Sequence, residues 1–118
     1  MYGHTAIDDV DTHDLDGIDP TLIPVGMALE TSEMRPSVWA YDAGESNDVH
    51  SHEAQEELYV PLSGRFELRI EDELVELGEG ELIVVEPETR RQVRALEAGH
   101  ILVVGAPPVK DDHMVDEP

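Results

Sequence analysis

The most informative part of the sequence is residues 44–64, which read GESNDVHSHEAQEELYVPLSG. His50 and His52 are two residues apart, so on a β-strand both imidazoles project from the same face. Glu57 comes after four intervening residues, at the start of the next apolar segment. Two imidazoles and one carboxylate form a donor set that binds Fe, Mn, Ni or Zn and leaves coordination positions open. We therefore treat His50, His52 and Glu57 as candidate metal ligands; the alternative is that the histidine pair is incidental.

Apolar and polar residues alternate with period two around this stretch. Phe66, Leu68 and Ile70 alternate with charged residues, which is typical of a half-buried strand. Short apolar runs rich in β-branched residues add further strands, and no segment has a convincing helical period. The predicted strands cover 21–29, 35–41, 57–62, 66–70, 82–85 and 101–104. With turn residues between them, these segments predict an all-β fold, an antiparallel sandwich or barrel.

The two ends of the chain are acidic and poor in apolar residues. We expect an acidic N-terminal arm over 1–20, with one short strand near 4–10, and a barrel over 21–108. Residues 109–118 are expected to form an acidic, frayed C-terminal tail.

The charge balance excludes several classes of partner. The 118 residues, enough for one domain, include 28 acidic and 7 basic side chains, for a formal net charge of −21. A chain without a basic stripe is not expected to bind nucleic acid or an anionic membrane. The sequence has no cysteine, no long apolar run and no leader, so we expect a cytoplasmic protein. The acidity predicts a surface solvated in a high-salt interior; the alternative is a surface that binds cations or a partner.

The spacing of the site residues points to one family. The frame Gly44-x5-His50-x-His52-x4-Glu57-x6-Gly64 resembles the first signature of the cupin superfamily, with every fixed position filled. The likeness extends more loosely over residues 21–107, and small single-domain cupins of bacteria and archaea are the most similar group. The resemblance implies a small antiparallel β-barrel, or jelly roll, with His50, His52 and Glu57 at the metal-ligand positions. Gly44 and Gly64 would be the turns that begin and end this strand pair.

The family's second signature, Gly-x5-Pro-x-Gly-x2-His-x3-Asn, is not preserved here. Its histidine is the fourth ligand of the family. An ungapped alignment from Gly80 puts Glu86 on the proline and Arg91 on that histidine, whereas a shift by one residue puts Gln92 there. The ungapped register directs Arg91 and Val93 inward and Gln92 outward, which agrees better with the apolar pattern. We therefore expect Arg91 in the fourth-ligand position.

Arginine only donates hydrogen bonds and stays protonated, so Arg91 cannot coordinate a cation. Three outcomes remain open. Arg91 pairs with Glu57 and the pocket is metal-free, or it binds a substrate carboxylate beside a three-ligand metal, or it is structural. Metal binding and a metal-free pocket therefore both remain open.

Several other residues are candidates for a role in the pocket. Tyr59 shares the inward face of Glu57 and is a candidate pocket residue and acid or base; barrel packing is the alternative. Trp39 is a candidate substrate contact, although it and Tyr41 fit the core at least as well. The remaining histidines have no partner at ligand spacing and are expected at the surface or satisfied by neighbours; they are His4, His13, His100 and His113.

The function that follows is a small-molecule-binding cupin domain protein with a candidate divalent metal site. One alternative is a metal-dependent enzyme of the dioxygenase or isomerase type that uses the two-histidine, one-glutamate site. Another is a purely structural module. The partners expected are a small-molecule ligand and a second copy of the chain, with the N-terminal arm adding to the sheet edge of the partner.

Overall fold

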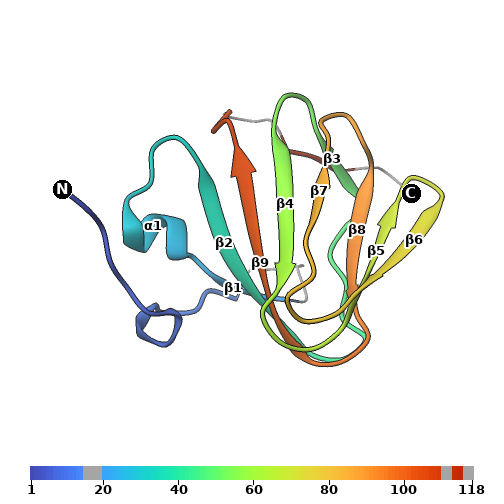
Figure 1. Ribbon diagram of the computed structural model, residues 1–118, viewed down its shortest axis with the longest axis horizontal. Helices are drawn as coiled ribbons and strands as arrows, with labels where there is room; N and C mark the ends of the chain where they lie inside the picture. The colour runs from blue at the N-terminus through green and yellow to red at the C-terminus, as the bar shows by residue number, and fades with distance from the viewer. Residues whose placement is uncertain (15–19, 110–112, 116–118) are drawn as a thin grey trace.

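Two five-stranded sheets face each other in the computed structural model, which describes residues 1–14, 20–109 and 113–115 (Figure 1). Strands of the first sheet lie in the order β1 (Thr21–Ile23), β2 (Arg35–Tyr41), β9 (Gly99–Ala106), β4 (Glu56–Pro61) and β7 (Ile83–Val85). Strands of the second lie in the order β10 (His113–Val115), β3 (His50–His52), β8 (Arg91–Ala95), β5 (Phe66–Ile70) and β6 (Glu73–Leu77). All the named strand pairs are antiparallel, which confirms the predicted all-β fold.

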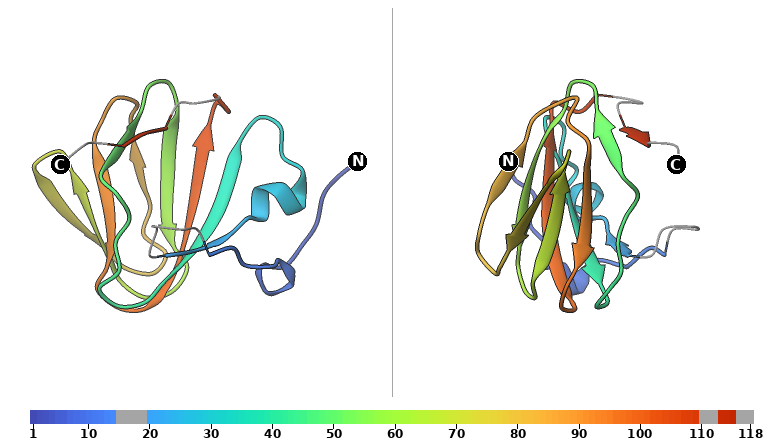
Figure 2. Two further views of the ribbon diagram at one scale, coloured as in Figure 1. Left: turned by 180° about the vertical axis from the view of Figure 1, so that it is seen from behind. Right: turned by 90° about the vertical axis from the view of Figure 1, so that its right-hand side faces the viewer.

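The core lies between the sheets, whose strands Figure 2 shows from two further sides. It is built from the inward residues of the alternating strands, including Tyr59, Phe66, Leu68 and Val93, all buried. Tyr41 meets Phe66 edge to face, with the ring centroids 5.4 Å apart. A core of this kind stabilises the fold because it removes apolar side chains from water.

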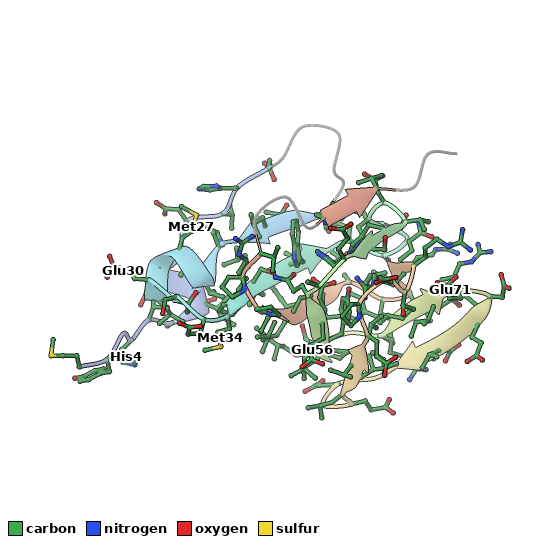
Figure 3. All side chains as sticks on the ribbon, turned by 90° about the horizontal axis from the view of Figure 1, so that it is seen from above. His4, Met27, Glu30, Met34, Glu56 and Glu71 are labelled. Carbon is green, nitrogen blue, oxygen red and sulfur yellow. The ribbon has the colours of Figure 1, made fainter. Side chains whose placement is uncertain are left out.

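Strand β4 carries the alternation that positions the site. Glu57, Tyr59 and Pro61 are buried, whereas the side chain of Glu56 is exposed. Figure 3 shows Glu56, with Glu30 and Glu71, among the exposed acidic side chains of the barrel. Successive side chains of a strand point to opposite faces. The carboxylate of Glu56 is therefore in water, whereas that of the next residue, Glu57, is inside the barrel.

Strand β8 has the register that the ungapped alignment predicted. Arg91, Val93 and Ala95 are buried, and Arg94 is exposed. Arg91 pairs with His50 across β3 and β8. The inward position of Arg91 is therefore confirmed, and Gln92 points the other way.

The prediction of one strand over 21–29 is only partly right. Strand β1 ends at Ile23, and helix α1 (Val25–Leu29) follows directly after Pro24. Proline lacks the N–H that a strand ladder needs and suits the start of a helix. The helix ends at Glu30, which has a φ of 55° and donates its N–H to carbonyls of the preceding turn. One turn of helix is too short to leave a periodic pattern in the sequence.

The predicted strand near residues 4–10 is wrong. The chain forms a 3₁₀ turn there, η1 (Ile7–Asp9), closed by the N–H of Val10 on the carbonyl of Ile7. Ile7 and Val10 pack against the small cluster beside α1. Two acidic residues in the first turn also favour a helical start over a strand. None of the helices in the described residues has the length and apolar content needed to cross a membrane.

The site frame implied β3 and the register argument implied β8, but β6 and β10 were not predicted from the sequence. Strand β6 completes a hairpin with β5, and its alternation is obscured because Leu74 is exposed next to Val75. Strand β10 lies in the segment expected to fray, yet it pairs with β3 through three residues. Other parts of the predicted arm and tail, residues 15–19, 110–112 and 116–118, lie outside the described residues.

Two glycines predicted as turns have the backbone that turns require. Gly44 has a φ of 87° and Gly64 a φ of 80°, in the left-handed region that residues with a side chain rarely adopt. At Gly64 a Cβ would also lie 2.6 Å from the carbonyl oxygen of Ala98. The hairpin after β4 therefore needs glycine for both conformation and space.

Candidate metal centre and cavity

Strand β3 presents two imidazoles to the space between the sheets. His50 and His52 are 5% and 6% exposed, and Ser51 between them is only partly buried. Nδ1 of His50 lies 3.0 Å from the carbonyl oxygen of Asp48. A carbonyl can only accept a hydrogen bond, so Nδ1 carries a proton and Nε2 is the ring nitrogen directed toward Glu57. A metal ligand needs this orientation, with Nε2 free of its proton when the metal binds.

Strand β4 brings a carboxylate to the same point from the opposite sheet. Oε1 of Glu57 lies 3.3 Å from Nε2 of His52 and 3.6 Å from Nε2 of His50. Ligand atoms around one tetrahedral metal ion at about 2.0–2.2 Å are roughly 3.3–3.6 Å apart. The distances from Glu57 to the two imidazoles therefore fit ligands of a single divalent metal.

Glu57 is held as a carboxylate. The hydroxyl of Tyr59 donates a hydrogen bond of 2.6 Å to Oε1 of Glu57. Burial alone would raise the pKa of Glu57, but hydrogen bonding from His50, His52 and Tyr59 outweighs it and holds the pKa well below its usual range. Glu57 is therefore a negatively charged candidate ligand for a metal at neutral pH.

Tyr59 is fixed in its protonated form. It is buried, and burial first, then the charge of Glu57, raises its pKa well above the usual value. A phenol in this setting donates a proton in a hydrogen bond and does not serve as a resting base. In this structure Tyr59 acts as a hydrogen-bond donor to Glu57.

Arg91 lies behind the carboxylate rather than in the cavity. Its side chain is 0% exposed, with Nη1 3.6 Å from Oε1 of Glu57. Nη2 donates a hydrogen bond of 2.8 Å to the carbonyl oxygen of Glu86. Among the described residues, Arg91 is not part of the cavity wall. The structure therefore brings Arg91 to Glu57, the pairing named in the first of the three outcomes, and Arg91 is not among the residues that line the cavity.

His113 is the site residue that the sequence missed. Its ring stacks on that of His50 with centroids 4.6 Å apart and meets that of His52 edge-on at 5.2 Å. One ligand atom from each of the three histidines lies within 4.8 Å of the others. Partial burial, followed by the charges of His50 and His52, lowers the pKa of His113. No short spacing in the sequence signals this contact, because it depends on the pairing of β10 with β3.

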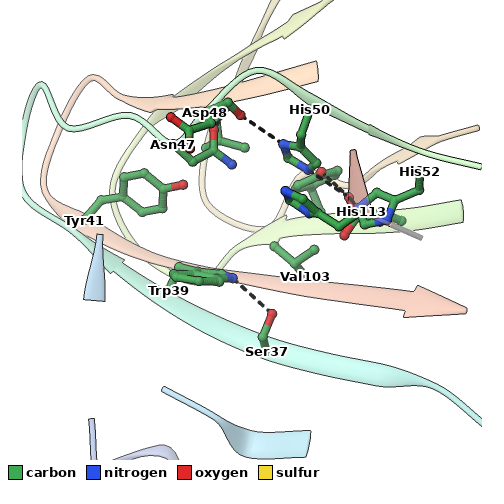
Figure 4. Close-up of a pocket in the computed structure, with 12 residues that line it drawn as sticks. Ser37, Trp39, Tyr41, Asn47, Asp48, His50, His52, Val103 and His113 are labelled. Atoms are coloured by element: carbon green, nitrogen blue, oxygen red, sulfur yellow. Dashed lines mark hydrogen bonds and ion pairs between the residues drawn. The ribbon is translucent and has the colours of Figure 1, made fainter. Parts of the chain in front are cut away.

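A cavity of about 160 Å³ opens beside these groups, between the two sheets. Figure 4 shows the three imidazoles together on one side, with Trp39 and Tyr41 on the other sides. The indole N–H of Trp39 donates to Oγ of Ser37 at 3.1 Å. The lining residues are Ser37, Trp39, Tyr41, Asn47, Asp48, His50, His52, Glu57, Tyr59, Val93, Val103 and His113. Trp39 on β2 and Tyr59 on β4 thus both reach the cavity. These two strands lie on either side of β9 in the first sheet.

The other histidines behave as predicted. His4, His13 and His100 are exposed. His13 takes part in the fold through its backbone, which exchanges hydrogen bonds of 2.7 and 2.9 Å with Leu22. None of the three lies on the wall of the cavity.

Comparisons with known proteins agree with this architecture. A family model described as a cupin domain matches residues 37–105. The fold is similar to that of KdgF from Halomonas sp., at 20% identity and a TM-score of 0.78, covering 94% of this chain and 98% of that one. An RmlC-like cupin from Shewanella frigidimarina is 16% identical with a TM-score of 0.77, covering 94% and 98% of the two chains. Oxalate decarboxylase from Bacillus subtilis is 18% identical with a TM-score of 0.76, covering 94% of this chain and 31% of that one. No curated protein matches the sequence.

Proposed function

Because this chain belongs to the cupin domain family, we propose that it binds a small molecule in its cavity, beside a divalent metal held by His50, His52 and Glu57. The observation that carries the proposal is the approach of Oε1 of Glu57 to within 3.3 and 3.6 Å of the two imidazoles, on the wall of the cavity. When bound, a divalent metal at this point supplies a Lewis acid that attracts an oxygen atom of the ligand.

The cavity limits what the ligand can be. A volume of about 160 Å³ is close to that of an apolar cavity of about 150 Å³ that holds benzene. Trp39, Val93 and Val103 supply apolar walls, the imidazoles stand together on one side, and Glu57 contacts two of them. We therefore expect a compact molecule with one apolar part and one oxygen-bearing group that faces the metal.

The metal part of the proposal is tested by elemental analysis of protein purified without added metals. We expect about one equivalent of Fe, Mn, Ni or Zn per chain, and its loss in His50→Ala. His100→Ala, in an exposed histidine away from the cavity, is the matched control and should keep the metal. A chain that contains no metal and takes up none from added Mn(II), Ni(II) or Zn(II) would contradict the proposal.

A metal-dependent enzyme of the dioxygenase or isomerase type is the second candidate. It is favoured by Tyr59, whose protonated hydroxyl lines the cavity and hydrogen-bonds to Glu57. Tyr59 would then act as the acid that gives a proton to a bound molecule. In that case Tyr59→Phe keeps metal and ligand affinity but loses turnover, whereas for a binding protein the variant changes affinity alone.

We also propose that the chain works in a salt-rich cytoplasm and as a homodimer. The net charge of −21 supports the first point, since a high salt concentration screens self-repulsion. Exposed apolar side chains at one sheet edge support the second: Leu82 is 65% exposed, and Val84 on the edge strand β7 is 53% exposed. Burying them against a second copy would remove them from water.

A further inference from the structure

The edge strand β10 places a third imidazole beside the candidate metal ligands. We propose that His113 is a metal ligand delivered by this C-terminal strand, so that His50, His52, His113 and Glu57 form a site of three imidazoles and one carboxylate. The proposal rests on the proposed function, because it concerns the metal that His50, His52 and Glu57 are inferred to hold.

Strand pairing explains why His113 points into the site. His113 lies directly opposite His52 in the antiparallel pair of β10 and β3. Residues opposite each other on neighbouring strands project from the same face of the sheet. His52 faces the cavity, so His113 must face it too, and His113 is indeed among the residues that line it (Figure 4).

The two neighbours of β3 make unequal contributions to a metal site. On one side β8 presents Arg91, whose guanidinium has donors only and cannot coordinate a cation. On the other side β10 presents an imidazole, which offers a lone pair at neutral pH. Among the described strands next to β3, β10 is thus the one that adds a ligand.

The three rings are close enough to bind one ion after a small adjustment. Their ligand atoms lie within 4.8 Å of one another, against about 3.3–3.6 Å around a tetrahedral ion. Closure around an ion needs a small movement of His113, and this residue is exposed and lies on an edge strand of three residues. Strand β10 can supply that movement more easily than the central strands.

A metal bound by His113 would also affect the stability of strand β10. In the described part of the chain, strand β10 pairs with one neighbour, β3. A metal bound by His113 would tie β10 to β3 and β4 through its other ligands. Metal binding should therefore stabilise the C-terminal strand locally, and the strand should open more readily when the metal is removed.

The main test is calorimetric titration of Ni(II) into metal-stripped protein. We expect His113→Ala to weaken binding by about tenfold or more, while the matched control His100→Ala, another exposed histidine, leaves it unchanged. If wild type and His113→Ala bind equally while His50→Ala binds weakly, the role of His113 is overturned and the proposed function stands. If wild type binds no metal at all, both are overturned.

Two further measurements keep the test independent of folding. The Cu(II) complex of wild type should show three coordinating nitrogens in its electron paramagnetic resonance spectrum, and that of His113→Gln two. Hydrogen exchange of the peptide containing residues 113–115 should slow on addition of Ni(II) in wild type but not in His113→Gln. A spectrum with two nitrogens in both proteins, or metal-independent exchange in wild type, would contradict the proposal.

Discussion

Nη1 of Arg91 lies 3.6 Å from Oε1 of Glu57, the same oxygen that faces His50 and His52. The carboxylate therefore lies between an internal cation and the two imidazoles. Without a metal, Arg91 offsets the buried charge of Glu57. With a metal, the ion and Arg91 share one negative charge, and the repulsion between the two cations weakens metal binding.

Replacing Arg91 with histidine should strengthen metal binding. Arg91→His removes the neighbouring positive charge and adds a potential ligand on the inward face of β8. We expect divalent metal to bind at least about tenfold more tightly, or about 1.4 kcal/mol. Titration of Mn(II) or Ni(II) measures this, with Arg94→His, an exposed position of the same strand, as the control. Equal affinities for wild type and Arg91→His would contradict the prediction.

Removing the carboxylate should have the opposite effect. Glu57→Gln keeps the size of the side chain but removes a charged ligand and leaves Arg91 buried without its anion. We expect metal affinity to fall by at least about tenfold and the free energy of unfolding of the metal-free protein to fall by about 3 kcal/mol. Glu56→Gln changes the exposed neighbour and should alter neither quantity. The prediction fails if the two variants behave alike in both metal titration and urea denaturation.

Tyr41 and Tyr59 should lose their hydroxyl protons only at a pH well above that of a free tyrosine. Burial, followed by nearby carboxylates, raises the pKa of Tyr59 and of Tyr41 well above the usual value. These pKa values are higher in the folded than in the unfolded chain. The stabilisation they reflect is therefore complete below about pH 10 and is lost as the pH rises further. Absorbance at 295 nm should show no phenolate from Tyr41 or Tyr59 in native protein up to about pH 11, so Tyr59→Phe and wild type give the same curve. Different native curves for these two proteins below that pH would contradict the prediction.

Stability should depend strongly on salt. The formal net charge of −21 on 118 residues produces self-repulsion that is screened over about 3 Å at 1 M salt, against about 10 Å at 0.1 M. We expect the melting midpoint to rise by tens of degrees between low salt and molar KCl. NaCl at equal concentration is the control and should act equally, because screening depends on ionic strength. A midpoint that is flat across this range would contradict the prediction.

The homodimer is tested by light scattering in 2 M KCl. The expected mass is about twice the chain mass of 13.1 kDa. Leu82→Glu should shift the equilibrium toward the monomer because it places a charge on the exposed apolar edge, whereas Met27→Glu, on helix α1, should not. A mass of one chain at all concentrations would contradict the homodimer.

Local patterns were sufficient for much of the barrel and for part of the site. Period two identifies most of the strands, and the same pattern puts Arg91 and Val93 on the inner face of β8, where both are buried. The same rule put His50 and His52 on one face of β3. These inferences succeed because the pleat of a strand fixes side-chain direction residue by residue.

Contacts between distant segments depend on packing, and the alternation of apolar and polar residues does not predict them. Facing of the two sheets brings Glu57 to 3.3 Å from His52, and pairing of β10 with β3 sets His113 against both imidazoles. The short helix after Pro24 was hidden because one turn leaves no period. Alternation along the chain indicates which face of the sheet a residue occupies. It does not indicate which strands become neighbours, because the place of each strand in the barrel depends on all the others.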